Sequence, residues 1–242
     1  RAIGLTWVHS SSGLKLPLGK IAQVVSAANN GRADADRILM IVDGVHGLGI
    51  ENTTVGEMGC DFLAAGTHKW IFGPRGTGLI WGKNSAWAQL IPTIPSFDDL
   101  ELYTAWMQNR NPQGPTRASW VAPGGFMAYE HQWAAADAFQ FHMKIGKKRI
   151  ADRIHELNSL CKDELAQNKR VKLYTPRSSQ LSAGIVCFDV DGLQPNEVVK
   201  RLLDKNIIAS TTPYGKSYAR LASGIMNSEA DVKAAVQAIE QM

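Results

Sequence analysis

Short apolar runs and helical stripes alternate along the first third of the chain. Residues 2–8, 38–42, 62–65 and 78–81 are apolar runs of strand length, and residues 17–30 place apolar side chains at helical spacing. The run at 38–42 is continuously apolar, which is typical of a strand buried on both faces of a parallel sheet. Strands and helices in this order predict an α/β fold with a mostly parallel sheet.

The rest of the chain predicts a loop, a long helical segment and a second, smaller unit. Residues 84–123 are rich in proline and polar residues and predict a long loop, whereas residues 126–167 form one helical pattern that is interrupted near Gly146. Ser228 and Asp231 match a capping box for the last helix. A compact α+β unit is predicted from strands at 183–190, 207–210 and 218–221 and helices at 196–203 and 231–239.

Composition excludes several classes of protein. The chain has 242 residues, 45% hydrophobic and 20% charged, with a net charge of +4 from basic residues that are scattered along the sequence, so a nucleic-acid site is not expected. No apolar run approaches the roughly 20 residues of a membrane span.

The three cysteines form neither a paired framework nor a CxxC motif, so we expect a reducing compartment, the cytoplasm, and no structural metal. The chain starts at Arg1 directly in a strand-like run, so we expect residues upstream of it.

Polar side chains follow the ends of two predicted strands. Asp43 comes directly after the run at 38–42, and Lys69 follows the run at 62–65. Apolar residues flank Lys69, and desolvation there would lower the pKa of the amine, as a Schiff-base lysine requires. A carboxylate at the neighbouring strand end would keep a pyridine nitrogen protonated, so that the ring could act as an electron sink. Backbone N–H groups of the glycine-rich turn at 44–49 would suit a phosphate. The combination favours a pyridoxal 5'-phosphate (PLP) site.

The same residues also allow two other interpretations, a dinucleotide-binding loop and a metal site. Gly44, Gly47 and Gly49 follow a strand, as in a dinucleotide-binding loop, but their spacing is not GxGxxG. Asp43, His46 and His68 are candidate metal ligands, but they lack a compact ligand spacing. Both alternatives are disfavoured.

The segments "LMIVDGVHGLG" and "GCDFLAAGTHKWIFGPRGTGLIWG" resemble the class V aminotransferase family of fold-type-I PLP enzymes. "TWVHSSSGLKLPL" and "PGGFMAYEHQWAAADAF" are similar to the isopenicillin-N epimerase-like group of that family, and "YARLASGIMNSEADV" is similar to its carboxy-terminal domain. The resemblance implies the remainder of a large PLP-binding domain at 1–135, a connecting helix at 136–167 and a small C-terminal α+β domain at 168–242. The family's N-terminal third has no counterpart in the chain.

The resemblance also implies roles for individual residues. Lys69 matches the lysine that carries the cofactor, and Asp43 matches the carboxylate on the ring nitrogen. His46 matches a Gln or His near the phenolic oxygen, and Arg220 matches the arginine that holds the substrate carboxylate. Four further positions fall on cofactor contacts of the family: His68 and Thr67 near the phosphate, Ser10 near a cofactor oxygen, and Gly124–Gly125 at the phosphate of a neighbouring subunit.

The expected enzyme acts on an amino acid or amine through a Lys69 aldimine and works as a homodimer. The freed Lys69 amine would act as general base at the α-carbon, and transamination, epimerisation and β-elimination remain open. A cysteine desulfurase would need a mobile nucleophilic cysteine in the loop before Arg220, and none of the three cysteines fits. The alternatives to an aminotransferase or epimerase are a PLP-dependent lyase, a non-catalytic relative that keeps the fold, and a nucleotide-binding protein.

Overall fold

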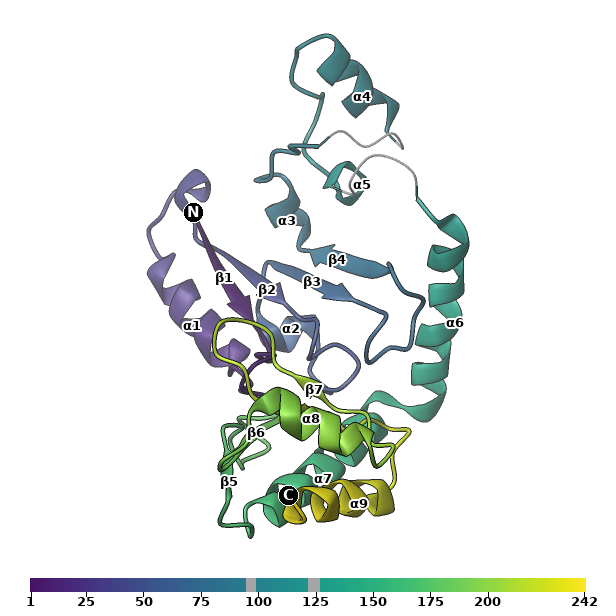
Figure 1. The fold of residues 1–242 in the computed structure, drawn as a ribbon. Helices are drawn as coiled ribbons and strands as arrows, with labels where there is room; N and C mark the ends of the chain where they lie inside the picture. The colour runs from purple at the N-terminus through teal and green to yellow at the C-terminus, as the bar shows by residue number, and fades with distance from the viewer. Residues whose placement is uncertain (95–98, 122–126) are drawn as a thin grey trace.

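The computed structural model describes residues 1–94, 99–121 and 127–242. Its first sheet has the order β1-β2-β3-β4, with three parallel strands and an antiparallel fourth strand (Figure 1). This confirms the predicted α/β architecture with a mostly parallel sheet. The strands are β1 (Ala2–Thr6), β2 (Leu39–Asp43), β3 (Phe62–Gly66) and β4 (Gly78–Gly82).

The helices between the parallel strands make the crossovers that a parallel sheet requires. Helix α1 (Leu18–Ala28) leads from β1 to β2, after which a short 3-10 helix, η1 (Asp34–Asp36), precedes the second strand. Helix α2 (Val55–Met58) lies between β2 and β3 and begins with a capping box of Thr54 and Glu57. The sequence analysis missed α2, although the Thr-x-x-Glu spacing was the signal for it.

The predicted long loop is wrong in part, because the segment contains three short helices: α3 (Asn84–Trp87), α4 (Leu100–Met107) and α5 (Ala118–Val121). Asp99 caps α4 by accepting the Leu102 N–H at 3.1 Å, and Leu102 and Trp120 are buried. Helices this short show too few turns for an apolar period to stand out in the sequence.

A long helical segment links the two sheets along one side of the molecule (Figure 1). It consists of α6 (Tyr129–Ile145) and α7 (Lys147–Leu165), which are separated at Gly146. The φ of Gly146 is 96°, a left-handed conformation that a residue without Cβ adopts readily, so the predicted interruption is confirmed. The three-part domain division of the sequence analysis stays a prediction.

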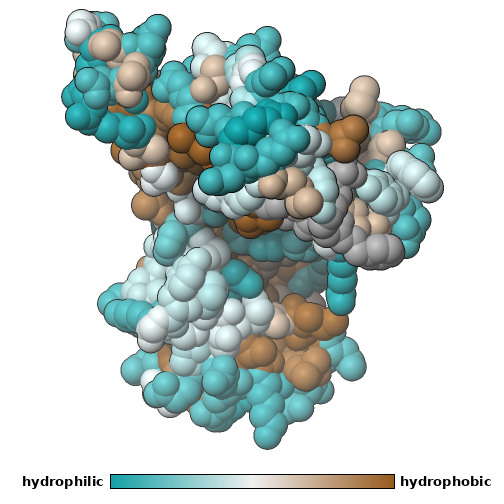
Figure 2. Space-filling model, turned by 90° about the horizontal axis from the view of Figure 1, so that it is seen from above, coloured by the Kyte–Doolittle hydropathy of each residue, from teal (hydrophilic) through white to brown (hydrophobic). Residues whose placement is uncertain are grey.

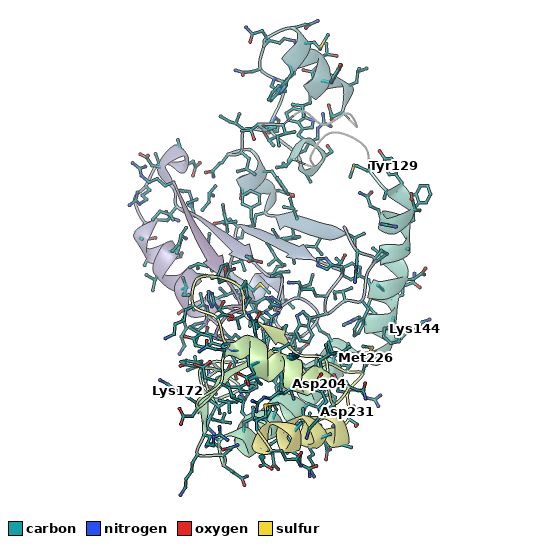
Figure 3. The ribbon with its side chains drawn as sticks, in the orientation of Figure 1. Tyr129, Lys144, Lys172, Asp204, Met226 and Asp231 are labelled. Carbon is teal, nitrogen blue, oxygen red and sulfur yellow. The ribbon has the colours of Figure 1, made fainter. Side chains whose placement is uncertain are left out.

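The second sheet is antiparallel with the order β5-β6-β8-β7, and α7, α8 and α9 pack on it. This confirms the predicted α+β unit, although β5 was missed because three residues are too short a run to recognise. Ser228 accepts the Asp231 N–H at the start of α9, which confirms the predicted capping box. Figure 3 labels Asp231 on this helix. The elements are β5 (Val171–Leu173), β6 (Val186–Val190), α8 (Pro195–Leu203), β7 (Ser210–Thr211), β8 (Ala219–Leu221) and α9 (Glu229–Glu240).

The two sheets share part of one hydrophobic core. Ile185 directly precedes β6, and Cys187 lies in it. Both pack in the same cluster as Met40 and Val42 of β2 and Trp7, which follows β1. The shared core therefore holds the edge of the second sheet over the first.

Within the described residues, no helix is both long and apolar enough to cross a membrane. On the face shown in Figure 2, apolar surface is broken into separate patches between hydrophilic residues.

Candidate active site

A cavity of about 400 Å³ lies where the carboxyl ends of the parallel strands face the edge of the second sheet. This volume falls within the roughly 300–1,000 Å³ that is typical of ligand pockets. The structure brings together five of the predicted site residues in its wall: Ser10, Asp43, His46, Lys69 and Arg220. The other residues that line it are Thr6, Val45, Thr211, Thr212, Pro213 and Tyr214.

Asp43 reaches the cavity because strand register aligns the ends of the first sheet. It is the last residue of β2 and pairs with Thr6 on one side and with Ala64 on the other. Its Oδ1 accepts the Val45 N–H at 3.0 Å, which holds the carboxylate at the start of the following turn. An exposed carboxylate thus stands at the strand rim, where ligands of open α/β sheets bind.

Lys69 lies in the turn between β3 and β4. The Phe72 N–H donates to the Lys69 carbonyl at 3.3 Å, and Phe72 has a φ of 61°, so the chain reverses directly after the lysine. Desolvation by burial, followed by the charge of Arg220, lowers the pKa of the Lys69 amine, while Asp43 acts in the opposite direction. The lowered pKa and its leading cause are those that the sequence predicted.

His46 connects Lys69 to the rest of the site. Its Nε2 lies 3.3 Å from the Lys69 Nζ, and its Nδ1 accepts the indole N–H of Trp70 at 3.3 Å. Burial, with the charges of Lys69 and Arg220, lowers the pKa of His46 to about 4. The imidazole is therefore neutral at physiological pH.

Arg220 approaches the cavity from the second sheet. Its position in β8 places it opposite Ser210 of β7 and Cys187 of β6. The Nε donates to the Ser210 Oγ at 3.0 Å, and Nη1 donates to the Ser10 carbonyl at 3.3 Å. These two bonds orient the planar guanidinium, whose remaining donors suit a carboxylate. Ser10 thus contacts the site through its backbone oxygen.

Two further predicted residues are not brought to the wall of the cavity. Thr67 is 1% exposed and its hydroxyl bonds to the Thr77 Oγ1, which in turn donates to the Pro74 carbonyl. His68 is exposed, and its ring lies close to the Gly66 Cα. Gly124–Gly125, the predicted contact to a neighbouring subunit, lies outside the described residues.

Most backbone N–H groups of the glycine-rich turn are engaged within the protein, and the phosphate contact suggested from the sequence stays a prediction. The N–H groups of residues 44, 45, 47, 48, 50 and 51 all donate within the protein. The glycines make room for aromatic rings instead. A Cβ at Gly47 would lie 2.1 Å from the Trp7 ring, and a Cβ at Gly49 would lie 2.9 Å from the Trp70 Cβ.

Comparison with known proteins identifies the family. The Aminotransferase class-V family model matches residues 3–238. The chain belongs to this family. Class V aminotransferases are PLP-dependent enzymes, so membership confirms the fold type and the cofactor that the sequence predicted.

The curated relatives of this class V member have different activities. A probable cysteine desulfurase of Halalkalibacterium halodurans is 26% identical over 213 residues, which are 86% of this chain and 47% of the relative. An isopenicillin N epimerase of Streptomyces clavuligerus is 27% identical over 191 residues, 75% of this chain and 44% of the relative. The chain thus spans about half the length of these relatives.

Solved structures agree with the class V fold. The apo cysteine desulfurase of Thermococcus onnurineus NA1 has a TM-score of 0.81 at 20% identity, over 99% of this chain and 59% of that chain. The cystine C-S lyase C-DES, in complex with its product cysteine persulfide, also has a TM-score of 0.81 at 20% identity, over 100% of this chain and 61% of that chain. At this identity the likeness establishes the fold.

The cavity of this class V member fits the family's cofactor. It combines a carboxylate at one strand end, a buried neutral imidazole and a lysine whose pKa is lowered. The imidazole presents one nitrogen to the lysine, and the other nitrogen is already bonded to Trp70. A carboxylate, a hydrogen-bonding ring and an amine are the groups that a pyridine ring with a phenolic oxygen and an aldehyde would use.

The three cysteines lie in environments that oppose thiol chemistry. Cys60, Cys161 and Cys187 are at most 1% exposed. Burial raises the pKa of each thiol, to about 12 for Cys161 and to about 11 for Cys187. A nucleophilic cysteine needs an accessible thiolate, and none of the three provides one.

Sequence reasoning missed several residues of the wall. Tyr214 is exposed and has a φ of 80°, an unusual conformation for a residue with a Cβ, at the turn between β7 and β8. Thr211 and Thr212 reach the cavity from the same edge. Pro213 and Gly215 indicate a tight turn in the sequence, but the sequence does not show that this turn lines the cavity.

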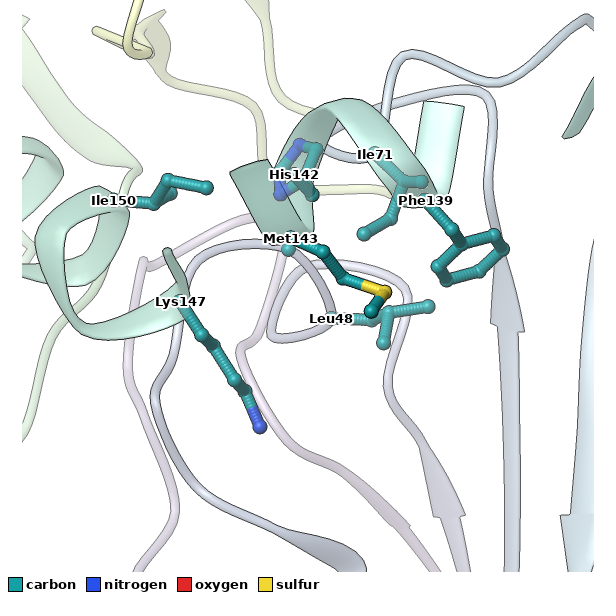
Figure 4. Close-up of a pocket in the computed structure, with 8 residues that line it drawn as sticks. Leu48, Ile71, Phe139, His142, Met143, Lys147 and Ile150 are labelled. Atoms are coloured by element: carbon teal, nitrogen blue, oxygen red, sulfur yellow. The ribbon is translucent and has the colours of Figure 1, made fainter. Parts of the chain in front are cut away.

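A second cavity, of about 160 Å³, lies between α6 and the turns that follow β2 and β3 (Figure 4). Its wall is mainly apolar, with Leu48, Ile71, Phe139, Met143 and Ile150. It is smaller than typical ligand pockets. His142 lines it and hydrogen-bonds to the Trp70 backbone, so this part of α6 supports the segment after Lys69.

Proposed function

We propose that this class V family member is a PLP-dependent enzyme that moves the α-proton of an amino acid, with Lys69 as the base. The observation that carries the proposal is the convergence of Lys69, Asp43, His46 and Arg220 on one cavity from two different sheets. A structural lysine gains little from such surroundings, since desolvation and the charge of Arg220 disfavour its charged form and only Asp43 favours it.

The first sheet would hold the cofactor. Lys69 would attach it covalently, Asp43 would pair with its ring nitrogen, and the His46 ring would hydrogen-bond to its phenolic oxygen. When bound, PLP supplies an electron sink that acidifies the α-hydrogen of an amino acid.

The second sheet would bind the substrate. Arg220 is fixed by Ser210 and by the Ser10 carbonyl, and its remaining donors would hold the α-carboxylate. With the carboxylate held there, the α-carbon would lie in the cavity that Lys69 also lines. The lowered pKa of Lys69 increases the fraction of its amine that is neutral and able to take the proton.

We further propose that the reaction is epimerisation or transamination. In the first, a proton returns to the opposite face of the α-carbon, and in the second it returns to the cofactor. The buried cysteines support this choice over thiol-based desulfuration. The second candidate is elimination of a β-substituent, which needs no protein thiol. Similarity to a probable hercynylcysteine sulfoxide lyase of Mycobacterium tuberculosis favours it, at 26% identity over 209 residues.

The test has two stages. Purified protein is mixed with PLP and treated with borohydride, and the labelled peptide is identified by mass spectrometry; we expect Lys69 to carry the label. A panel of amino acids in heavy water is then followed for α-proton exchange, keto acid and ammonia. Exchange with inversion indicates an epimerase, keto acid without ammonia a transaminase, and keto acid with ammonia a lyase.

Lys69→Ala should abolish both the label and the exchange. Lys144→Ala is the matched control, because Lys144 is exposed near the C-terminal end of α6, outside the cavity (Figure 3). A colourless protein in which Lys69→Ala changes nothing would favour a non-catalytic relative instead.

A homodimer is proposed from the family resemblance, and light scattering on the purified protein would test it. Cytoplasmic localisation stays a prediction from the cysteine content.

A further inference from the structure

Trp70, the residue after Lys69, makes a side-chain hydrogen bond that the proposed reaction does not use. Its indole Nε1 lies 3.3 Å from the Nδ1 of His46. An indole N–H can only donate, so Nδ1 must accept. A neutral imidazole carries one proton, and that proton must therefore be on Nε2.

This tautomer determines what His46 offers to Lys69. The two nitrogens are 3.3 Å apart, and an Nε2 that carries a proton can only donate across that distance. The Lys69 Nζ must then accept through its lone pair, which an ammonium group does not have. The contact therefore stabilises the neutral amine over the charged one.

Trp70 is held too tightly to turn its N–H elsewhere. A Cβ at Gly184 would lie 2.8 Å from the Trp70 Cη2, and a Cβ at Gly49 would lie 2.9 Å from its Cβ. The Trp70 backbone is hydrogen-bonded to His142 of α6. The backbone is thus confined beside Gly49 and the ring beside Gly184, two glycines from different parts of the chain.

The charges around His46 keep its ring neutral, so only the position of its single proton can differ. Arg220 acts on the ring as a positive charge, as Lys69 does whenever it is protonated, and the carboxylate of Asp43 acts on Lys69. Burial and Arg220 disfavour an imidazolium even when Lys69 is neutral. The ring is then neutral in either tautomer, and the Trp70 bond selects between the two.

We propose that Trp70 is a positioning residue that locks His46 in the Nε2–H tautomer, so that the imidazole donates its one proton to Lys69 in the protein without cofactor and would donate it to the cofactor oxygen once PLP is bound. The part of this inference that concerns the cofactor rests on the proposed function. The part that concerns Lys69 does not.

The test replaces the indole N–H without changing the ring shape. Trp70→benzothienylalanine places sulfur where the N–H was, and Trp70→Phe is the simpler second variant. The control is Trp87→Phe. Trp87 is buried, whereas Trp70 is partly buried; Trp87 donates its N–H to the Gly82 carbonyl at 3.1 Å and lies in a separate core cluster. Nitrogen NMR of the His46 ring is measured on the protein without PLP and after PLP is added.

In the unmodified protein we expect a protonated Nε2 and an unprotonated, hydrogen-bonded Nδ1. Loss of the donor should lower the ratio of the Nε2–H to the Nδ1–H form by roughly 5-fold, the factor for one hydrogen bond of average net strength. The Nε2 of the Nδ1–H form would accept from a Lys69 ammonium. Labelling of Lys69 by an amine reagent in the absence of PLP should therefore need a higher pH. In a His46→Ala background the same replacement should not move the labelling curve.

Three results would overturn the proposal: a protonated Nδ1 in the unmodified protein, an unchanged His46 spectrum in both Trp70 variants, or an equal change in the Trp87 control. Because these measurements need no cofactor chemistry, they separate the outcomes. A Trp70-dependent tautomer in a protein that binds no PLP would leave this inference standing and refute the proposed function.

Discussion

Replacing Arg220 should impair binding of the substrate carboxylate and, separately, change the protonation of Lys69. Two variants divide these effects. Arg220→Lys keeps the positive charge but loses the planar fork, and Arg220→Met loses both. Ser210→Ala is the control, because it removes one partner of the guanidinium and leaves Arg220 itself in place.

The magnitude follows from the bonds that Arg220 already makes. Its Nε and Nη1 are occupied by Ser210 and the Ser10 carbonyl, so the donors left for substrate lie mainly at Nη2. One hydrogen bond to a charged group contributes roughly 1.5–3 kcal/mol, so Arg220→Lys should lower kcat/KM by about 10- to 150-fold. Ser210→Ala loses a neutral partner, and its effect should stay within about 5-fold.

The pH dependence distinguishes the two variants. Arg220 is one of the causes that lower the pKa of Lys69. Without that charge the pKa of Lys69 rises, less of the amine is neutral at a given pH, and the ascending limb of kcat/KM moves to higher pH. This shift is expected in Arg220→Met and not in Arg220→Lys, since lysine retains the charge.

The assay compares the amino acid with the primary amine that lacks its carboxylate, over a range of pH. If Arg220 binds the carboxylate, Arg220→Lys should impair turnover of the amino acid and leave the slow turnover of the amine nearly unchanged. An equal loss for both substrates would refute the assigned role, because the amine has no group for the guanidinium to hold.

Two further outcomes test other features of the site. Gly47→Ala should lower the free energy of unfolding by about 1–3 kcal/mol, because the new Cβ would lie 2.1 Å from the Trp7 ring, whereas Gly4→Ala meets no atom within 4 Å and should be nearly neutral in chemical denaturation. Cys60, Cys161 and Cys187 should resist a thiol reagent until the protein is unfolded, and the reagent should leave activity intact; rapid loss of activity on modification would revive a thiol-dependent mechanism.

The first sheet and the positions of Asp43 and Lys69 at its rim could be predicted because both depend on local sequence. The run that ends at Asp43 and the run before Lys69 are continuous and apolar, and parallel strands place their carboxyl ends together. Arg220 was different. It lies in a three-residue strand of another sheet, and only the family resemblance pointed to it. The role of Thr67 stays a prediction: its hydroxyl bonds to Thr77, ten positions along the chain, and that partner could not be inferred from the sequence.

Trp70 shows most clearly what sequence could not supply. It was recognised as an apolar neighbour that desolvates Lys69, and that role is compatible with its place in the core. Its polar role depends on His46 lying within reach of one indole nitrogen, which requires the turn after β2 and the turn after β3 to be packed together. That packing in turn depends on Gly49 beside the Trp70 backbone and on Gly184 beside its ring, more than a hundred residues apart. A residue whose function is to orient another side chain carries no motif of its own. Such a residue becomes visible only in the structure, where the Trp70 indole N–H, which can only donate, faces the His46 ring, which has two possible tautomers.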